Sequence, residues 1–175
     1  QEKYGEKRIC VVDSHSASGG QTQIALLAMD LEEAGLPFEE IEKRLNAYRD
    51  EMKTYFVLDN LETLRKNGRL SEVKSMVAQT LNIKPVMSAR SGVIIQKSQA
   101  IGMKKALMKI RDYMLKEVAE LNEKRIVITH CNCPDRAEYL KELLKDKARL
   151  KEVLIMDTAG VSSMYANDGG VIVTA

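Results

Sequence analysis

The chain has 175 residues, of which 45% are apolar and 30% charged, and its formal net charge is +2. This length suits one domain or two small lobes, and the apolar share is large enough to form a hydrophobic core. No apolar run approaches the ~18 residues that a membrane span needs, so stable membrane insertion is not expected. Cationic and anionic residues are interleaved, which argues against a nucleic-acid partner.

The N-terminal residues and the cysteines indicate the cellular location. The first residues, QEKYGEKR, are polar and show no signal peptide. Three cysteines are too few for a disulfide framework, so a reducing, cytoplasmic location is expected. Because the first residue is Gln and not Met, the sequence is expected to be a piece of a longer protein.

The apolar patterns predict strands that alternate with helices. Strands are expected at 8–12, 54–58, 84–89, 93–97, 125–129, 153–156 and 171–174, and residues 90–92 are expected to form a hairpin turn. Helices are expected at 21–34 and 104–122, and from residues 37, 60, 71 and 134 onward. This order of elements predicts an α/β fold class, with a mixed sheet because of the hairpin.

The segment 13–20, DSHSASGG, joins the first predicted strand to a helix. Its hydroxyl and carboxylate groups combine with two glycines, and the N–H groups at a helix start attract anions. A carboxylate or phosphate is therefore expected near Ser14, Ser16 or Ser18, and a plain helix cap and turn is the alternative. A nucleophilic triad is not expected, because successive residues of an extended segment point apart.

Two other positions are candidates for binding an anion. Gly68 is expected to be a left-handed helix cap, after which the guanidinium of Arg69 either grips a carboxylate or phosphate or pairs with Glu72. The polar segment 162–170 is expected to be a loop that aims Tyr165 into a cleft, where its phenol can donate to a carboxylate. A tight turn with a packed tyrosine is the alternative there.

Two patterns suggest a metal or a tunnel. His130, Cys131 and Cys133 are soft ligands, but a closed zinc site needs a fourth, and the only other cysteine is Cys10. Reduced, half-buried thiols are expected, with no metal and no cofactor. Flexible methionines suit both a tunnel for an alkyl chain and ordinary core packing, and packing is the expected role of each; they include Met76, Met87, Met103, Met108 and Met164.

The order and spacing of these segments resemble the DegV family, bacterial proteins that bind fatty acids. The likeness covers nearly the whole chain and no single motif decides it. It is carried by VVDSHSASGG, TYFVLDNLETLRKNGRLS, the central block 61–107, IVITHCNCPDRAEYLKELL and AGVSSMYANDGGVIVTA. The resemblance implies a two-lobed α/β architecture, with 1–53 as the remnant of an incomplete first lobe and 54–175 as the C-terminal lobe.

The resemblance also implies a function. Members of this family hold a long-chain fatty acid in an apolar tunnel with its carboxylate at a polar mouth, and some present it to a separate fatty acid kinase. A non-enzymatic protein is therefore expected, with no catalytic residue. The residues expected near the carboxylate are Ser14, Ser16, Ser18, Arg69 and Tyr165.

Three features depart from the family pattern. The chain starts partway into that pattern, so much of the carboxylate site is expected in a preceding segment. Tyr165 stands where many relatives have a histidine. Residues 100–103 read Ala-Ile-Gly-Met where relatives often carry arginines, which leaves only Lys104 and Lys105 as cations there.

Two other functions stay open. A phosphotransfer subunit related to dihydroxyacetone kinase would use a histidine to hold its ketone, and His15 and His130 are the only two histidines. A lipid-free interaction domain would instead form a homodimer through an exposed apolar face.

Overall fold

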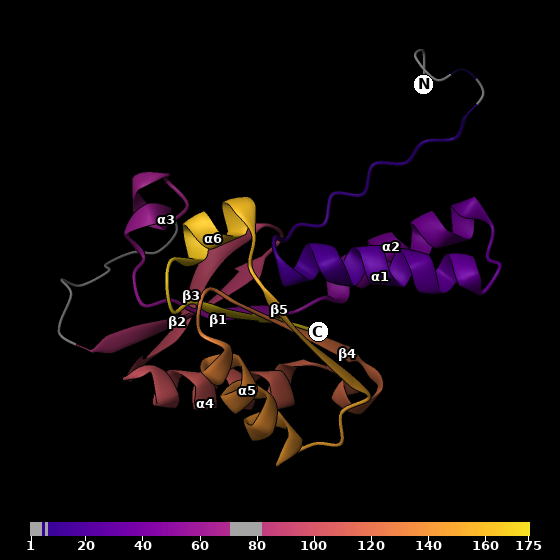
Figure 1. The fold of residues 1–175 in the computed structure, drawn as a ribbon. Coiled ribbons are helices and arrows are strands. Elements are labelled where there is room, and N and C mark those ends of the chain that lie inside the picture. The colour runs from indigo at the N-terminus through magenta and orange to yellow at the C-terminus, as the bar shows by residue number, and fades with distance from the viewer. Residues whose placement is uncertain (1–4, 6, 71–81) are drawn as a thin grey trace.

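The computed structural model describes residues 5, 7–70 and 82–175 of the chain. These residues form one six-stranded sheet with the strand order β3-β2-β1-β6-β4-β5 (Figure 1). Strands β4 and β5 run parallel, and every other neighbouring pair is antiparallel. The strands are β1 (Thr54–Val57), β2 (Ile83–Arg90), β3 (Val93–Ile101), β4 (Arg125–His130), β5 (Glu152–Asp157) and β6 (Val171–Thr174).

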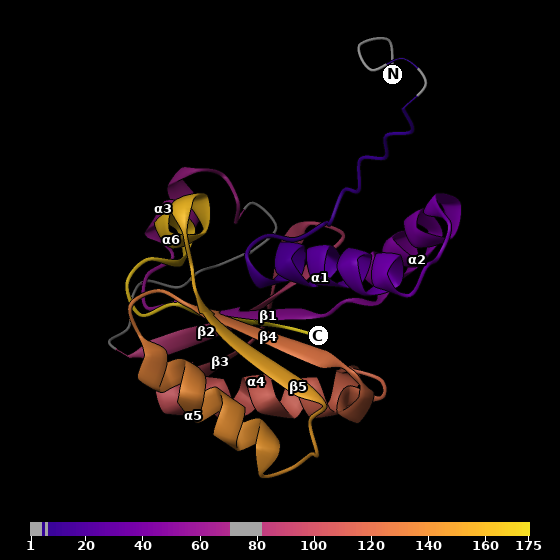
Figure 2. The same cartoon turned by 45° about the vertical axis from the view of Figure 1, so that its right-hand side comes forward.

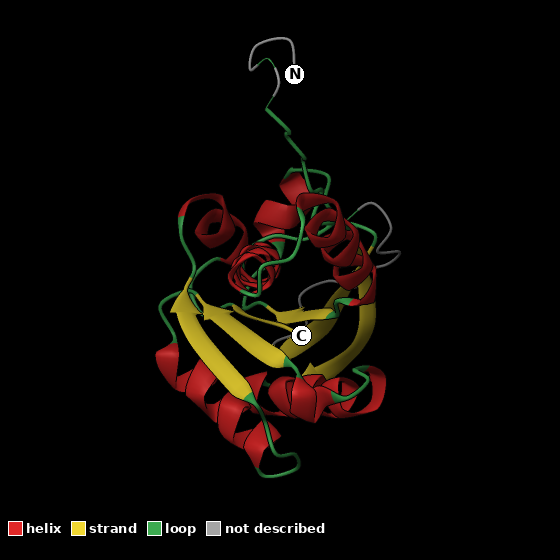
Figure 3. Ribbon diagram, turned by 90° about the vertical axis from the view of Figure 1, so that its right-hand side faces the viewer, coloured by secondary structure: helices red, strands yellow, loops and turns green. Residues whose placement is uncertain are grey.

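Helices cover both faces of the sheet (Figures 2 and 3). One face carries α1 (Gly19–Glu33), α2 (Phe38–Glu51), α3 (Glu62–Lys66) and α6 (Gly160–Ala166). The other carries α4 (Met103–Glu117) and α5 (Pro134–Lys145), and a 3-10 turn at Leu121–Glu123 leads into β4. No described helix is both long enough and apolar enough to cross a bilayer.

The central strand β1 is buried on both faces, which explains its continuous apolar sequence. Tyr55 and Val57 point into the core beneath α4 and α5. Phe56 points the opposite way, into a smaller apolar cluster with Leu64 of α3. The two faces of the sheet therefore have separate apolar interiors, and the smaller one leads to the candidate site.

The mixed α/β fold predicted from the sequence is confirmed, including the hairpin of β2 and β3 and the left-handed conformation of Gly68, whose φ is 66°. The helix predicted from residue 71, and with it Glu72 and Met76, lies outside the described residues. The division of the chain at residue 53 remains a prediction. Helix α1 packs on β4 and β6, so residues from both sides of that division share one interface.

The strand predicted at 8–12 is wrong. Residues 7–12 form no strand and lead away from the body of the molecule (Figures 1 and 2), with Ile9 and Val11 48% and 89% exposed. A strand needs a neighbour for its N–H and C=O groups, and no described strand lies beside this segment. Arg8 instead pairs with Glu39 and lies over the ring of Phe38.

Two further boundaries differ from the prediction. The helix predicted to run to residue 122 ends at Glu117, because Val118 is extended and Glu120 has a φ of 50°. Val118 and Leu121 are nevertheless buried, as the apolar pattern predicted. The segment predicted as a loop from residue 162 begins inside α6, so Tyr165 stands on a helix.

Candidate functional site

A cavity of about 570 Å³ lies on the sheet face that carries α3 and α6. Its volume falls within the ~300–1,000 Å³ typical of small-molecule sites. The apolar part of its wall is formed by Phe56, Leu58, Leu64, Ile94, Val161, Ala166 and Ile172. The polar part is formed by Asp13, His15, Ser16, Ser18, Thr54, Arg69, Ser162 and Tyr165. The cavity therefore suits a ligand with one polar and one apolar part.

The polarity of the wall changes along β1 and the residue that follows it, Leu58. Alternate residues of a strand point to the same face, so Thr54, Phe56 and Leu58 all face the cavity. Four residues at about 3.3 Å each separate the first from the last by about 13 Å. The hydroxyl of Thr54 is 3.5 Å from that of Ser16, whereas Leu58 is only 3% exposed and lies in the apolar cluster.

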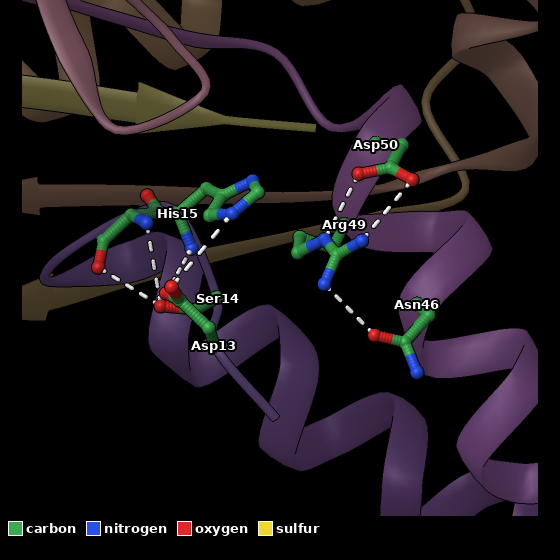
Figure 4. Close-up of polar contacts among 7 residues, drawn as sticks. Asp13, Ser14, His15, Asn46, Arg49 and Asp50 are labelled. Atoms are coloured by element: carbon green, nitrogen blue, oxygen red, sulfur yellow. Dashed lines mark hydrogen bonds and ion pairs between the residues drawn. The ribbon is translucent and has the colours of Figure 1, made fainter. Parts of the chain in front are cut away.

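The polar end is shaped by residues 13–18, which fold into a tight turn before α1 (Figure 4). The backbone N–H of His15 donates to Oδ1 of Asp13 at 3.1 Å, and the hydroxyl of Ser14 donates to the carbonyl of Ser16 at 2.9 Å. Ser18 has a φ of 54° and its hydroxyl is 2.8 Å from that of Thr129 on β4. The turn is therefore anchored both internally and to the sheet.

Helix α1 is held close to the sheet at the same end. A Cβ on Gly19 would lie 3.1 Å from the side chain of Val127, so only glycine fits without displacing a neighbour. One turn further, the amide of Gln23 is 2% exposed and donates to the carbonyls of Arg125 at 2.8 Å and Thr174 at 3.2 Å. These contacts fix the start of α1, and with it the positive end of the helix dipole, beside Ser16 and Ser18.

Arg69 reaches the cavity from the turn after α3, and Tyr165 reaches it from α6. The backbone N–H of Arg69 donates to the carbonyl of Leu64 at 2.9 Å, which closes α3 behind Gly68. The Arg69 side chain is exposed and forms no ion pair with a described residue. Tyr165 is half-buried on α6 and packs against the apolar cluster.

Four of the five residues expected near a carboxylate line this cavity: Ser16, Ser18, Arg69 and Tyr165. The fifth, Ser14, lines a smaller cavity beside it. Thr54 was not predicted as a site residue, although a polar residue at the start of a buried apolar strand was a usable signal. No described methionine lines the main cavity, and Met87 is fully buried in the apolar cluster, so packing is the role the structure gives it.

The cysteines near β4 hold a turn. Cys131 exchanges backbone hydrogen bonds with Gly170 and Gly169, and the thiol of Cys133 lies 3.4 Å from the carbonyl of Gly170. Burial raises the pKa of the Cys133 thiol. Within the described residues no group of three potential metal ligands gathers here or elsewhere.

His130 is 5% exposed and lies on the α4–α5 side of the sheet, away from the cavity. Its Nδ1 is 3.4 Å from Oδ1 of Asp157, but it makes no hydrogen bond of good geometry within the described residues. His15, the other histidine, lines the cavity, and its Nε2 is 3.7 Å from Oδ2 of Asp13.

The fold and the cavity together define an α/β protein with a cavity that is polar at one end and apolar at the other. The chain belongs to the DegV family. The model of that family, described as an uncharacterised protein of the DegV family, matches residues 1–175.

Relatives of known structure include two with bound fatty acids. A DegV family protein of Ruminococcus gnavus, refined with vaccenic acid, is 48% identical with a TM-score of 0.94, over 99% of this chain and 62% of that one. The fatty acid kinase B3 protein of Streptococcus pneumoniae, loaded with linoleic acid, is 32% identical with a TM-score of 0.89, over 99% of this chain and 61% of that one.

The curated relatives are longer than this chain. A DegV domain-containing protein of Clostridium perfringens is 30% identical over 155 residues, which are 88% of this chain and 53% of the relative. One from Streptococcus pneumoniae is 33% identical over 172 residues, which are 98% of this chain and 60% of the relative. The chain thus spans between half and two thirds of the relatives it matches.

Proposed function

We propose that the chain binds one long-chain fatty acid, with the alkyl chain along the apolar wall of the cavity and the carboxylate at its polar end. The observation that carries this is the change from Thr54 to Leu58 along one wall of a single cavity. The bound vaccenic and linoleic acids of the two relatives support the same ligand class.

The tail supplies most of the binding free energy in this arrangement. Each buried methylene contributes ~0.8 kcal/mol, so ten of them give about 8 kcal/mol before the loss of ligand freedom is subtracted. An exposed charge at a helix N-terminus adds only about 0.3–1 kcal/mol. The carboxylate end therefore orients the ligand more than it holds it.

The polar groups have distinct roles in this orientation. Ser16 and Ser18 offer hydroxyls beside the N-terminus of α1, which has 15 residues. Arg69 supplies the cation at the cavity, and the phenol of Tyr165 supplies a neutral donor. Ser14 holds the turn through its bond to the Ser16 carbonyl and so supports the ligand contacts indirectly.

We infer a carrier role, in which the carboxylate is presented to a separate enzyme. The name of the Streptococcus pneumoniae relative, a fatty acid kinase B3 protein, supports a kinase as that enzyme. The chain's own part is to keep the tail out of water and to hold the carboxylate at the polar end. The same proposal places the protein in the cytoplasm and gives it no catalytic step of its own.

The first experiment is solvent extraction of the purified chain, followed by mass spectrometry of the extract, with the Ruminococcus gnavus protein as positive control. One fatty acid per chain in both samples is the expected result. An acid in the control alone would refute binding by this chain and locate an essential part of the site in the additional length of the relative.

A pair of variants tests the cavity itself. Ile172→Ser places a hydroxyl in the apolar wall and is expected to reduce the bound acid severalfold. Met156→Ser makes a similar change on β5, 40% exposed and outside the cavity, and is expected to leave the bound acid unchanged. Equal losses in the two variants would refute the assigned wall.

A further inference from the structure

A second cavity, of about 260 Å³, adjoins the first. The two share His15, Thr54 and Ala89 in their walls. The second cavity lies where β1 begins and β2 ends, and the last turns of α2 and α4 reach it through Arg49 and Glu117. Figure 4 shows its α2 side, where Arg49 and His15 come from separate segments.

The wall of this cavity carries more cations than acids. Its cations are Arg49, Lys53, Arg90 and Lys97, and its acids are Asp50 and Glu117, so four positive charges face two negative ones. The main cavity, in contrast, is lined by one arginine, Arg69, and one carboxylate, Asp13. The second cavity therefore favours an anion with more than one negative charge.

Two of the four cations already have partners. Arg49 donates from Nε and Nη2 to the carboxylate of Asp50, at 2.9 and 3.2 Å, and from Nη1 to Asn46 at 2.8 Å (Figure 4). Lys97 donates to Glu117 at 2.9 Å. Both also lie near helix ends, whose carbonyl groups carry partial negative charge. Arg49 and Lys97 are thus largely balanced by their own surroundings.

Lys53 and Arg90 are not balanced in this way. Neither forms an ion pair with a residue in the described part of the chain. Tyr55 pairs with Ser88 across β1 and β2, and Lys53 and Arg90 each lie two residues beyond that pair, in the wall of the second cavity. Like charges in the wall of one cavity repel. An anion between them would remove that repulsion.

The hydroxyls on the cavity floor do not compete for this role. The phenol of Tyr55 donates to Glu117 at 2.9 Å, and the hydroxyl of Ser88 donates to the carbonyl of Thr54 at 2.8 Å. These two donors are committed to the protein, so the two cations remain for an anion, together with the exposed hydroxyl of Ser91 next to Arg90 in the chain. A guanidinium and an ammonium in the wall of one cavity are suited to phosphate oxygens.

We propose that the second cavity binds a phosphate group between Lys53 and Arg90, either as free phosphate or as the head of a single-chain lipid whose tail occupies the first cavity. The lipid form rests on the fatty-acid proposal above, and the free form does not. A phosphate monoester carries about −1.5 to −2 charge at pH 7, against −1 for a carboxylate, so it matches the two cations better.

The test compares three probes by calorimetry and by NMR of the backbone amides: inorganic phosphate, dodecanoate and dodecyl phosphate. Dodecyl phosphate is expected to bind about tenfold more tightly than dodecanoate. Inorganic phosphate is expected to shift the amide signals of Lys53 and Arg90. The double variant Lys53→Gln/Arg90→Gln should lose both effects and still bind dodecanoate. The control Lys104→Gln/Lys105→Gln removes the same charge from exposed positions of α4 and should keep both effects.

The outcomes separate the proposals. Shifts with inorganic phosphate but no advantage for dodecyl phosphate would support the free form and refute the lipid form. Phosphate binding without dodecanoate binding would support the second cavity and refute the fatty-acid proposal. Phosphate effects that persist in the Lys53→Gln/Arg90→Gln variant, or that are absent from the wild type, would overturn the phosphate site.

Discussion

Gly20 lies at the start of α1, where the turn of residues 13–18 meets the helix. A Cβ at this position would lie 2.6 Å from Cβ of Ser16 and closer still to its hydroxyl, with Cε of Met52 at 3.2 Å. The methionine end can move aside, but a Cβ atom moves only with its backbone. Gly20→Ala is therefore expected to push Ser16 and its turn away from the helix.

Two opposite effects set the size of the change. Alanine stabilises a helix over glycine by about 0.5–1 kcal/mol. Overpacking a well-filled site costs about 1–3 kcal/mol. The clash should win, so the free energy of unfolding should fall by about 1 kcal/mol, which lowers Tm by about 2–4 °C in a chain of this size. Fatty acid affinity should fall as well, because Ser16 lines the polar end of the cavity.

Urea unfolding of four proteins tests this reasoning: the wild type, Gly20→Ala, Ser16→Gly and the double variant. Ser16→Gly removes the atoms with which the new methyl group collides. In that background Gly20→Ala should therefore stabilise the chain, by up to 1 kcal/mol. A change of the same sign in both backgrounds would refute the clash as the cause.

Three other predictions concern the anchor of α1, the ion pairs of Asp59 and the cavity. Gln23→Leu leaves two main-chain carbonyls without their donor and should lower the free energy of unfolding by about 2–4 kcal/mol in urea; a smaller loss than that of an exposed Gln→Leu control would contradict this. Burial opposes ionisation of Asp59, but bonds from Lys84 and Arg136 outweigh it and hold its pKa below the usual value. The wild type should therefore lose stability as the pH falls below about 4, and Asp59→Asn should lose less over the same range. Calorimetry with fatty acids from decanoate to tetradecanoate should show the affinity rising about fourfold per methylene. An affinity that does not change with chain length would rule out burial of the alkyl chain along the apolar wall.

Much of the fold follows from local pattern. The hairpin of β2 and β3, the start of α5 at Pro134 and the left-handed Gly68 each depend on a few neighbouring residues, and the structure confirms all three. The strand predicted at 8–12 shows the limit of this reasoning. Its apolar sequence is typical of a strand, but strand formation depends on a pairing partner that local sequence does not reveal.

The candidate site shows the same limit. Hydroxyls before a helix and a cation after a glycine were visible in the sequence, and the structure brings Ser16, Ser18 and Arg69 to one cavity. The second cavity was not foreseen. It depends on the pairing of β1 with β2, which brings Lys53 and Arg90 into one cavity wall, and register is a property of two strands that are separated in the sequence.

The strand order has a consequence for how the chain folds. β6 lies between β1 and β4, yet it follows both of them in the sequence. Until β6 is synthesised, the β1–β2–β3 meander and the β4–α5–β5 unit are two separate half-sheets, each with an open edge. Docking of β6 must close long loops on both sides, which slows folding and exposes those edges to other chains. During translation, the half-sheets are expected to avoid aggregation only if a chaperone covers their open edges or if β6 leaves the ribosome quickly and pairs with them.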